Sequence, residues 1–235
     1  MQNKRGVKIV IGIVVLVALA VTAGPYIYIH FIKDDAPKTL SIDQAPITTA
    51  ATTTTAATTP ATTDTTTTFT LTPDSQVGYR VVEVLFGQDT EGVGRTNAVT
   101  GSITLDGTAI AAADFTVDMT TLQSDEDNRD RKFKGEIMET STFPTATFTV
   151  SQPIELGSIP ADGDEITATA TGDLTLHGVT KSVTLDVTAK KAGNSIAIAG
   201  STDVTFADYG IANPSNGAVT TQDHGLIEFL LVATA

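Results

Sequence analysis

The residues of this chain that could perform acid–base or metal chemistry are few. There are three histidines and no cysteine, which excludes disulfides and thiolate zinc sites. His177 and His224, the two outside the N-terminal apolar run, could form at most a sparse metal or acid–base pair. His177 lies where one alternating segment ends and the next begins, so we interpret it as an outward-facing turn residue. Replacing such a residue is expected to cost no more than about 0.5 kcal/mol.

Sequence motifs of known catalytic sites are also missing. There is no GxSxG nucleophile elbow, no HExxH helix and no phosphate-binding loop, and GVG at 92–94 lacks the later glycine of a dinucleotide fingerprint. We therefore predict no enzyme, no catalytic residue, no cofactor and no metal. An unrecognised hydrolase stays open as an alternative.

The densest group of carboxylates lies in the segment SDEDNRDRKFKGEIM, residues 124–138. Its acids could bind calcium, but an EF-hand loop needs a further oxygen ligand and a glycine where this chain has Arg129 and Asp130. Ser124 and Asp127 instead form a capping-box arrangement with acids in the first turn. We predict that this segment is the one short helix of the domain.

Two glutamates interrupt strand faces that are otherwise apolar. Glu83 and Glu228 are each either a solvent-facing charge or a buried carboxylate that serves a ligand. Residues 226–233 are apolar on both faces, which predicts that a helix, a loop or another subunit covers their outer side. A homodimer is therefore possible.

The overall charge argues against nucleic acid as a partner. The chain carries 14 Lys and Arg against 27 Asp and Glu, a formal net charge of −13. An anionic surface repels phosphate backbones, so we expect no nucleic-acid partner.

The N-terminal region predicts a membrane anchor. Residues 9–32 carry no formal charge, and about 20 apolar residues suffice to cross a bilayer. Basic residues precede this run in excess, which predicts a cytoplasmic N-terminus. We expect residues 1–33 to form a cytoplasmic tip and a single-pass anchor in the cell membrane, with all later residues extracytoplasmic. A signal peptide cleaved after Val21–Ala23 is the alternative.

A linker follows the predicted anchor. Residues 48–68 consist almost entirely of Thr and Ala, a composition that cannot bury a core and is typical of extended, disordered stalks. We therefore assign residues 34–68 to a Thr/Ala-rich linker and residues 69–235 to the domain.

Within the domain, apolar residues recur with a period of two. In residues 166–176 Ile, Ala, Gly and Leu alternate with Thr and Asp, and the alternation resumes after GVT in residues 183–189, which predicts a hairpin. The same pattern recurs at 99–105, 115–119, 146–150 and 196–206. With the segments 79–86 and 226–233, it predicts an all-β fold of about eight antiparallel strands in a barrel or sandwich.

Several motifs of the domain resemble the YceI family. These are NRD before a phenylalanine, TFPTATFTVS, GDLTLHGVTKSVTLDV, and FADYGI ahead of the last apolar strand. The resemblance covers roughly residues 69–235. It implies a lipocalin-like antiparallel barrel with a helical excursion, which binds polyisoprenoid or other long-chain amphiphiles in its lumen. Two polar landmarks of the family are missing, because Asp74 stands where His is common and Phe206 stands where Arg is expected.

The inward strand faces predict where such a ligand would lie. Small residues in mid-strand cannot fill an eight-stranded interior, and barrels of that size can hold one small ligand. The candidate lumen residues are Val82, Val84, Phe86, Ile103, Phe115, Val117, Phe148, Ala168, Ala170, Leu174, Leu176, Ile227 and Phe229. Alternatively, the large side chains fill the gap and the barrel is solid.

Taken with the resemblance, the sequence predicts a membrane-tethered extracytoplasmic protein. Its expected partner is a long-chain lipid of polyisoprenoid or fatty-acyl type. The alternative is a cell-surface interaction module with a solid barrel and no ligand.

Overall fold

The computed structural model describes residues 36–47, 66–85, 87–215, 217 and 219–235, together with Gly24 and Ile27. The predicted anchor and most of the Thr-rich stretch lie outside the described residues, so both stay predictions. Among the residues that are described, no helix is long and apolar enough to cross a membrane.

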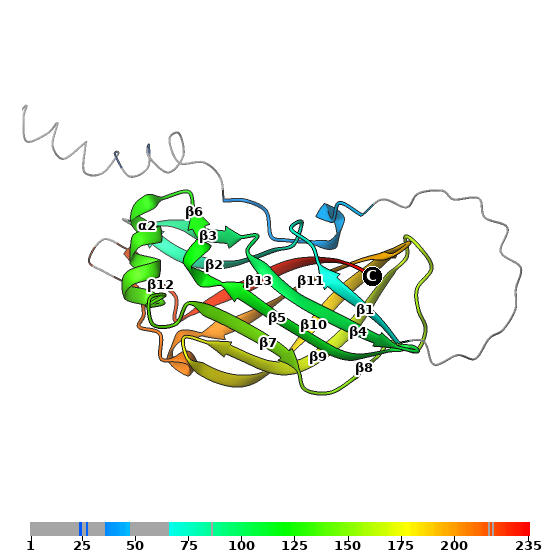
Figure 1. Ribbon diagram of the computed structural model, residues 1–235. Coiled ribbons are helices and arrows are strands. Elements are labelled where there is room, and N and C mark those ends of the chain that lie inside the picture. Colours follow the sequence, from blue (N-terminus) through cyan, green and yellow to red (C-terminus); the bar gives the residue numbers. More distant parts are fainter. Residues whose placement is uncertain are drawn as a thin grey trace, which may run out of the picture.

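The described strands form one antiparallel sheet (Figure 1). Their bounds are β1 Thr66–Leu71, β2 Gln76–Leu85, β3 Gln88–Thr96, β4 Val99–Asp106, β5 Ala109–Asp118, β6 Gln123–Ser124, β7 Thr145–Val150, β8 Ile154–Glu155, β9 Glu165–Leu176, β10 Val179–Ala192, β11 Ser195–Thr205, β12 Val219–Thr221 and β13 His224–Thr234. The helical elements are η2 Ile42–Gln44, η3 Met119–Thr121, α2 Asp127–Lys132, η4 Phe133–Ile137 and η5 Phe206–Tyr209.

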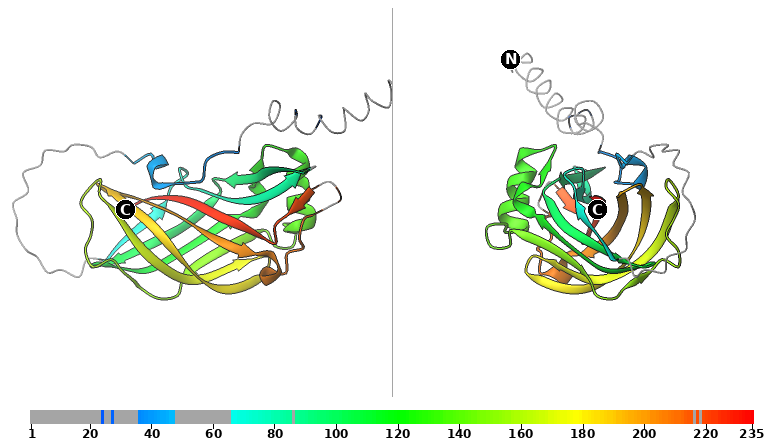
Figure 2. Two further views of the ribbon diagram at one scale, coloured as in Figure 1. Left: turned by 180° about the vertical axis from the view of Figure 1, so that it is seen from behind. Right: turned by 45° about the vertical axis from the view of Figure 1, so that its right-hand side comes forward.

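The sheet closes on itself through β13. β1 and β2 pair with successive parts of that strand: Leu71 lies opposite Ala233, and Gln76 lies opposite Leu230. β3 and β4 pair with β2 and β1 in the same way. β1 and β2 together therefore act as one interrupted strand of the ring, and β3 and β4 act as the next. The ring continues through β5, β7, β9, β10 and β11 back to β13. The sheet is therefore a closed antiparallel barrel of eight strands, seen in Figure 2, and the predicted all-β barrel is confirmed.

The predicted hairpin between β9 and β10 is confirmed, with Leu176 opposite Val179. Its two turn residues, His177 and Gly178, have positive φ values of 51° and 75°. Two-residue hairpin turns with positive φ at both positions match the right-handed twist of the flanking strands. A side chain at Gly178 would meet the ring of Phe143 at 2.5 Å, so glycine is needed there for space as well.

The expected outward position of His177 is wrong. Its side chain is half-buried, its ring packs edge-on against Phe143 with centroids 4.6 Å apart, and its Nδ1 lies 3.2 Å from the carbonyl oxygen of Tyr209. Because that oxygen can only accept, Nδ1 donates. His177 therefore joins the β9–β10 turn to η5.

The predicted helix exists but is short and is capped differently. α2 begins after Glu126, and Ser124 does not cap it. The hydroxyl and amide of Ser124 donate instead to Asp130 Oδ1, at 2.7 and 2.9 Å, while Asp125 is paired with Arg129. Within the described part of the chain, no group of three or more acidic or histidine side chains could hold a metal ion.

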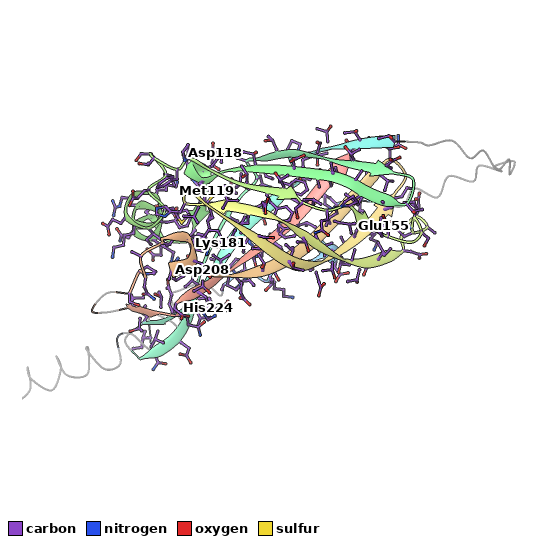
Figure 3. The ribbon with its side chains drawn as sticks, turned by 90° about the horizontal axis from the view of Figure 1, so that it is seen from below. Asp118, Met119, Glu155, Lys181, Asp208 and His224 are labelled. Atoms are coloured by element: carbon purple, nitrogen blue, oxygen red, sulfur yellow. The ribbon has the colours of Figure 1, made fainter. Side chains whose placement is uncertain are left out.

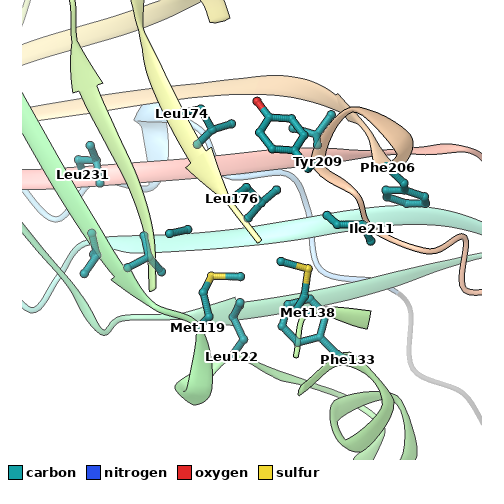
Figure 4. Packing of buried hydrophobic residues seen from close by; sticks show 14 residues of the cluster. Met119, Leu122, Phe133, Met138, Leu174, Leu176, Phe206, Tyr209, Ile211 and Leu231 are labelled. Carbon is teal, nitrogen blue, oxygen red and sulfur yellow. The ribbon is translucent and has the colours of Figure 1, made fainter. Parts of the chain in front are cut away.

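The barrel has two unlike ends. The helix end carries α2, η4, η5 and the β9–β10 turn, and the loop end carries the β4–β5 and β10–β11 turns with residues 151–164 (Figure 1). At the helix end an apolar cluster fills the space between α2 and the strands. Its members include Met119, Leu122, Phe133, Met138, Leu176 and Tyr209 (Figure 4).

An extended segment, residues 36–47, lies across the outside of β11 and β13 (Figure 2). We call it the strap. Two of its side chains, Leu40 and Ile42, are buried against the barrel. They pack on Ala197 and Ala199 of β11 and on Leu230 and Val232 of β13. The predicted cover over residues 226–233 is therefore a loop of the same chain. The linker prediction for 34–68 is wrong for residues 36–47, which pack on the barrel, and for residues 66–68, which belong to β1.

Candidate ligand-binding cavity

The barrel encloses a cavity of about 320 Å³. Side chains of strands, helical turns and loops line it, from Met119 of η3 and Phe133 of η4 at the helix end to Ile154 of β8 and Ile159 at the loop end. Almost all of these side chains are aliphatic or aromatic. Small-molecule sites have volumes of about 300–1,000 Å³ and mostly apolar walls with a few polar groups, so this cavity has the size and lining of a site for an apolar molecule.

Ten of the predicted lumen residues line the cavity. They are Ile103, Phe115, Val117, Phe148, Ala168, Ala170, Leu174, Leu176, Ile227 and Phe229. Phe115 and Phe148 lie nearly parallel with ring centroids 6.4 Å apart, and both line the cavity. The small residues Ala168 and Ala170 on β9 contribute to that space. That these residues contact a ligand stays a prediction.

The predicted positions on β2 are wrong. The cavity is lined by Val77, Tyr79, Val81 and Glu83, the odd-numbered face, whereas Val82 and Val84 lie on the opposite face. Val82 is 37% exposed, and Phe86 lies outside the described residues. β2 carries apolar residues on both faces, so the alternation alone did not decide which face points inward.

Glu83 forms the polar part of the cavity wall at the helix end. Its Oε2 lies 3.5 Å from Nη2 of Arg129, and the two side chains are only 17% and 18% exposed. Burial alone would lower the pKa of Arg129, but the carboxylates of Glu83 and Asp125 outweigh it and raise that pKa. The cavity wall therefore presents a carboxylate and a charged guanidinium side by side, which can accept and donate hydrogen bonds to a polar group.

Tyr79 lines this end of the cavity, two glycines leave room for Tyr79 and Glu83, and none of the three was predicted as a site residue. The Tyr79 ring stacks on Phe133 with centroids 4.7 Å apart and planes 9° apart, and burial raises its pKa. A side chain at Gly94 would meet the Tyr79 ring at 2.4 Å, and one at Gly92 would meet Glu83 at 2.7 Å. The signal in the sequence was GVG inside a strand, where glycine marks a close approach of another group.

Two lysines line the cavity at the loop end. Lys190 and Lys191 of β10 are paired with Glu165 and Asp162 at 3.5 and 2.5 Å. Asp162 Oδ2 also accepts from the Gly193 amide at 2.8 Å. These contacts join the loop before β9 to the end of β10, and they place cationic groups at the opposite end from Glu83 and Arg129.

The second interrupting glutamate, Glu228, lies on the outer face of β13 and is fully buried. Arg95 Nη2 donates to its Oε1 at 2.6 Å, and Arg80 Nε lies 3.5 Å from its Oε2. The strap covers this cluster. Glu228 is therefore a buried carboxylate, as one of the two alternatives held, but it serves the strap contact and not the cavity.

The two departures from the family pattern fall in different places. Phe206 is buried and lines the cavity, so it adds an aromatic ring where the resemblance implied an arginine. Asp74 is exposed in the turn between β1 and β2.

The closed barrel around an apolar cavity defines the class of fold, a small antiparallel β-barrel domain. The YceI-like domain model matches residues 49–233, and the chain belongs to the YceI-like family. The chain is 32% identical over 127 residues to a UPF0312 protein of Vibrio parahaemolyticus, an alignment that covers 50% of this chain and 64% of that protein. It is 37% identical over 89 residues to protein YceI of Escherichia coli O157:H7, covering 37% of this chain and 42% of that protein. The chain thus spans less than two thirds of the length of these relatives.

Two solved structures share the fold. A polyisoprenoid-binding domain from Saccharophagus degradans, implicated in plant cell wall breakdown, superposes with a TM-score of 0.58 at 18% identity, covering 72% of this chain and 98% of that one. BcnA of Burkholderia cenocepacia superposes with a TM-score of 0.55 at 24% identity, covering 70% and 99%. At these identities the likeness establishes the barrel fold alone.

Proposed function

We propose that the protein binds a long-chain apolar or amphiphilic molecule, of polyisoprenoid or fatty-acyl type, inside the barrel. The observation that carries this proposal is the cavity of about 320 Å³ with its almost wholly apolar wall. The domain from Saccharophagus degradans is described as polyisoprenoid-binding, which supports the same class of ligand here.

The polar groups of the cavity favour an amphiphile over a pure hydrocarbon. Glu83 and Arg129 stand at the helix end, and Lys190 and Lys191 stand at the loop end. Glu83 and Arg129 are paired with each other, but each has more hydrogen-bonding capacity than one partner uses. A ligand with one polar end group can bond to Glu83 and Arg129 while its chain fills the apolar part of the cavity.

We further propose that the domain acts outside the cytoplasm and is tethered to the cell membrane by residues 9–32. The support is the length and uncharged character of that run and the basic residues before it. In this proposal the role is binding and not catalysis, which is supported by the pairing of the polar groups in the wall and by the description of the Saccharophagus degradans domain as polyisoprenoid-binding.

Extraction of the purified protein with organic solvent, followed by mass spectrometry of the extract, tests the ligand proposal. We expect a stoichiometric long-chain molecule, or uptake of an added isoprenoid alcohol or fatty acid by the stripped protein. A protein that is empty as purified and takes up neither probe would support the alternative, a surface interaction module.

A further inference from the structure

Glu83 is the only acidic side chain among the described residues that line the cavity. β2 points its odd-numbered residues inward, so Glu83 follows Tyr79 and Val81 on the cavity face near the end of the strand. Its side chain is 17% exposed, and Arg129 Nη2 lies 3.5 Å from its Oε2. No other described residue bonds to this carboxylate, so Oε1 is left as a hydrogen-bond acceptor in the wall of an apolar cavity.

A glycine on the neighbouring strand leaves room for this acceptor. Gly92 of β3 lies opposite Val81, and a side chain there would meet Glu83 Oε1 at 2.7 Å and Arg129 Nε at 3.0 Å. The two polar side chains therefore lie over a bare stretch of backbone. Any larger residue at position 92 would displace the carboxylate or the guanidinium, so the present geometry of the pair depends on this glycine.

The charge around Glu83 is negative in spite of Arg129. That guanidinium also contacts Asp125, so two carboxylates share one cation. Asp130, which accepts from Ser124, adds a third acid close by. A ligand carboxylate placed here would meet like charges in a partly dehydrated site, which is unfavourable. A hydroxyl group carries no charge and can donate to Glu83 Oε1 in a charge-assisted hydrogen bond.

The closure of the helix end gives a second reason for a neutral group. The side chains that close it are buried: Met119, Leu122, Phe133 and Met138. At the opposite end of the barrel, where Glu155 lies in Figure 3, Ile159 lines the cavity and is still 38% exposed. A polar group that reaches Glu83 from the loop end must cross the apolar part of the cavity. Burying a hydroxyl group costs far less than burying a charge, so a neutral group can make this passage.

We propose that Glu83 selects a long-chain alcohol, whose hydroxyl group it binds at the helix end while the chain extends toward Ile154 at the loop end. This inference rests on the proposed ligand-binding function and narrows its ligand class. Glu83 Oε1 accepts the hydroxyl hydrogen, and the hydroxyl oxygen can accept from Arg129. A long-chain carboxylate binds more weakly, because it has no hydrogen to donate and is repelled by Glu83.

Competition among three molecules of equal chain length tests this selectivity. Full-length protein in a mild detergent is equilibrated with an equimolar mixture of dodecan-1-ol, its methyl ether and dodecanoate at pH 8, where dodecanoate is ionised. The protein is then re-isolated, and the bound molecules are quantified by mass spectrometry. The Ala168→Phe, Ala170→Phe double variant, whose cavity is filled, gives the background carried by the detergent. We expect the alcohol to bind about tenfold more tightly than the ether or the carboxylate, the effect of one charge-assisted hydrogen bond.

Glu83→Gln separates the role of the charge from that of the cavity. The variant keeps the shape of the side chain and an acceptor, but it frees Arg129 to pair with a ligand carboxylate. We expect the ratio of bound alcohol to bound carboxylate to fall about tenfold. The matched control is Asp89→Asn, which removes one negative charge from an exposed position of the same hairpin and should leave the ratio unchanged. If Glu83→Gln does not fold, the ratio in the native protein decides alone.

Other results would contradict this inference. Equal binding of all three molecules by the native protein, or a ratio that Glu83→Gln leaves unchanged, overturns the selectivity but leaves the ligand-binding function standing. Tight binding of dodecanoate that is lost in Lys191→Met places the polar end of the ligand at the loop end and also overturns it. A protein that takes up none of the three molecules overturns the proposed function, and this inference with it.

Discussion

Arg95 donates two hydrogen bonds to one oxygen of Glu228, from Nε at 2.9 Å and from Nη2 at 2.6 Å. The glutamate is fully buried and the arginine is 18% exposed. The pair joins β3 to β13 across β2, and the same guanidinium donates to the strap carbonyl of Lys38. One buried carboxylate therefore connects the barrel wall to the segment that covers it.

Removing this charge should weaken the fold. Glu228→Gln keeps the shape of the side chain but leaves two guanidinium groups without their shared anion. We expect the free energy of unfolding to fall by about 3 kcal/mol, since breaking a buried pair strands a charge. Denaturant unfolding measures this free energy. The control is Glu155→Gln at an exposed position, which should change the free energy of unfolding by about 0.5 kcal/mol or less. Equal losses in both variants would show that the pair contributes nothing.

Filling the cavity should abolish ligand uptake without unfolding the barrel. Ala168 and Ala170 both line the cavity, so changing both to Phe takes up ligand space. If four methylenes of the ligand are denied burial at about 0.8 kcal/mol each, affinity falls roughly two orders of magnitude. Uptake of a long-chain probe and the melting temperature are measured on the same variant. Thr167→Phe, at an exposed position on the same strand, is the control, and its uptake should be unchanged. A large fall in the melting temperature of the double variant would indicate a solid core.

His177→Ala should destabilise the domain and spare binding. The variant loses the contact with the Tyr209 carbonyl and the packing against Phe143, which we expect to cost about 1–2 kcal/mol. His177 does not line the cavity, so ligand uptake should stay within a few fold. His224→Ala, whose side chain is 43% exposed, is the matched control. Loss of uptake in a stable His177 variant would contradict this assignment.

The contact between Asp162 and Lys191 at the loop end should weaken at acid pH. The hydrogen bond from Lys191, and then that from the Gly193 amide, hold the pKa of Asp162 below its ordinary value of 3.8. A lowered carboxyl pKa stabilises the folded state above pH 3.8, and this contribution is lost as pH falls through the folded-state pKa. Titration of the Asp162 carboxyl carbon by NMR should show the low midpoint, and Lys191→Met should raise it. A midpoint at or above 3.8 in the wild type would refute the contact.

The strands could be predicted because their alternation is regular. The β9–β10 hairpin was expected from the period of two and from GVT, and its register places Ala170 opposite Leu185 as the pattern requires. On β2 the same rule failed, because Val81 and Val82 are both apolar and the exposed face there is not polar. Where both faces carry apolar residues, the twist and closure of the barrel decide which one points inward.

The candidate site could also be predicted only in part. Its apolar wall followed from the local alternation of residues, whereas the partners of its charged groups did not. Glu83 of the cavity wall meets Arg129 only because a strand and a helix distant in sequence are brought together. Outside the cavity, Glu228 meets Arg95 for the same reason. The strap was hidden for a different reason: it is short, irregular and adjacent to a low-complexity stretch, so nothing in its own composition marks it as packed.

The closure of the barrel through β13 also constrains how the protein can be made. Thr70 pairs with Thr234, so the first strand has no partner on one edge until the last residues of the chain have been synthesised. Contacts of such long sequence separation form late and slowly. The hydrophobic interior is therefore sealed only after β13 has been synthesised. Loss of even the last strand would leave the two sheet edges available for pairing with other chains.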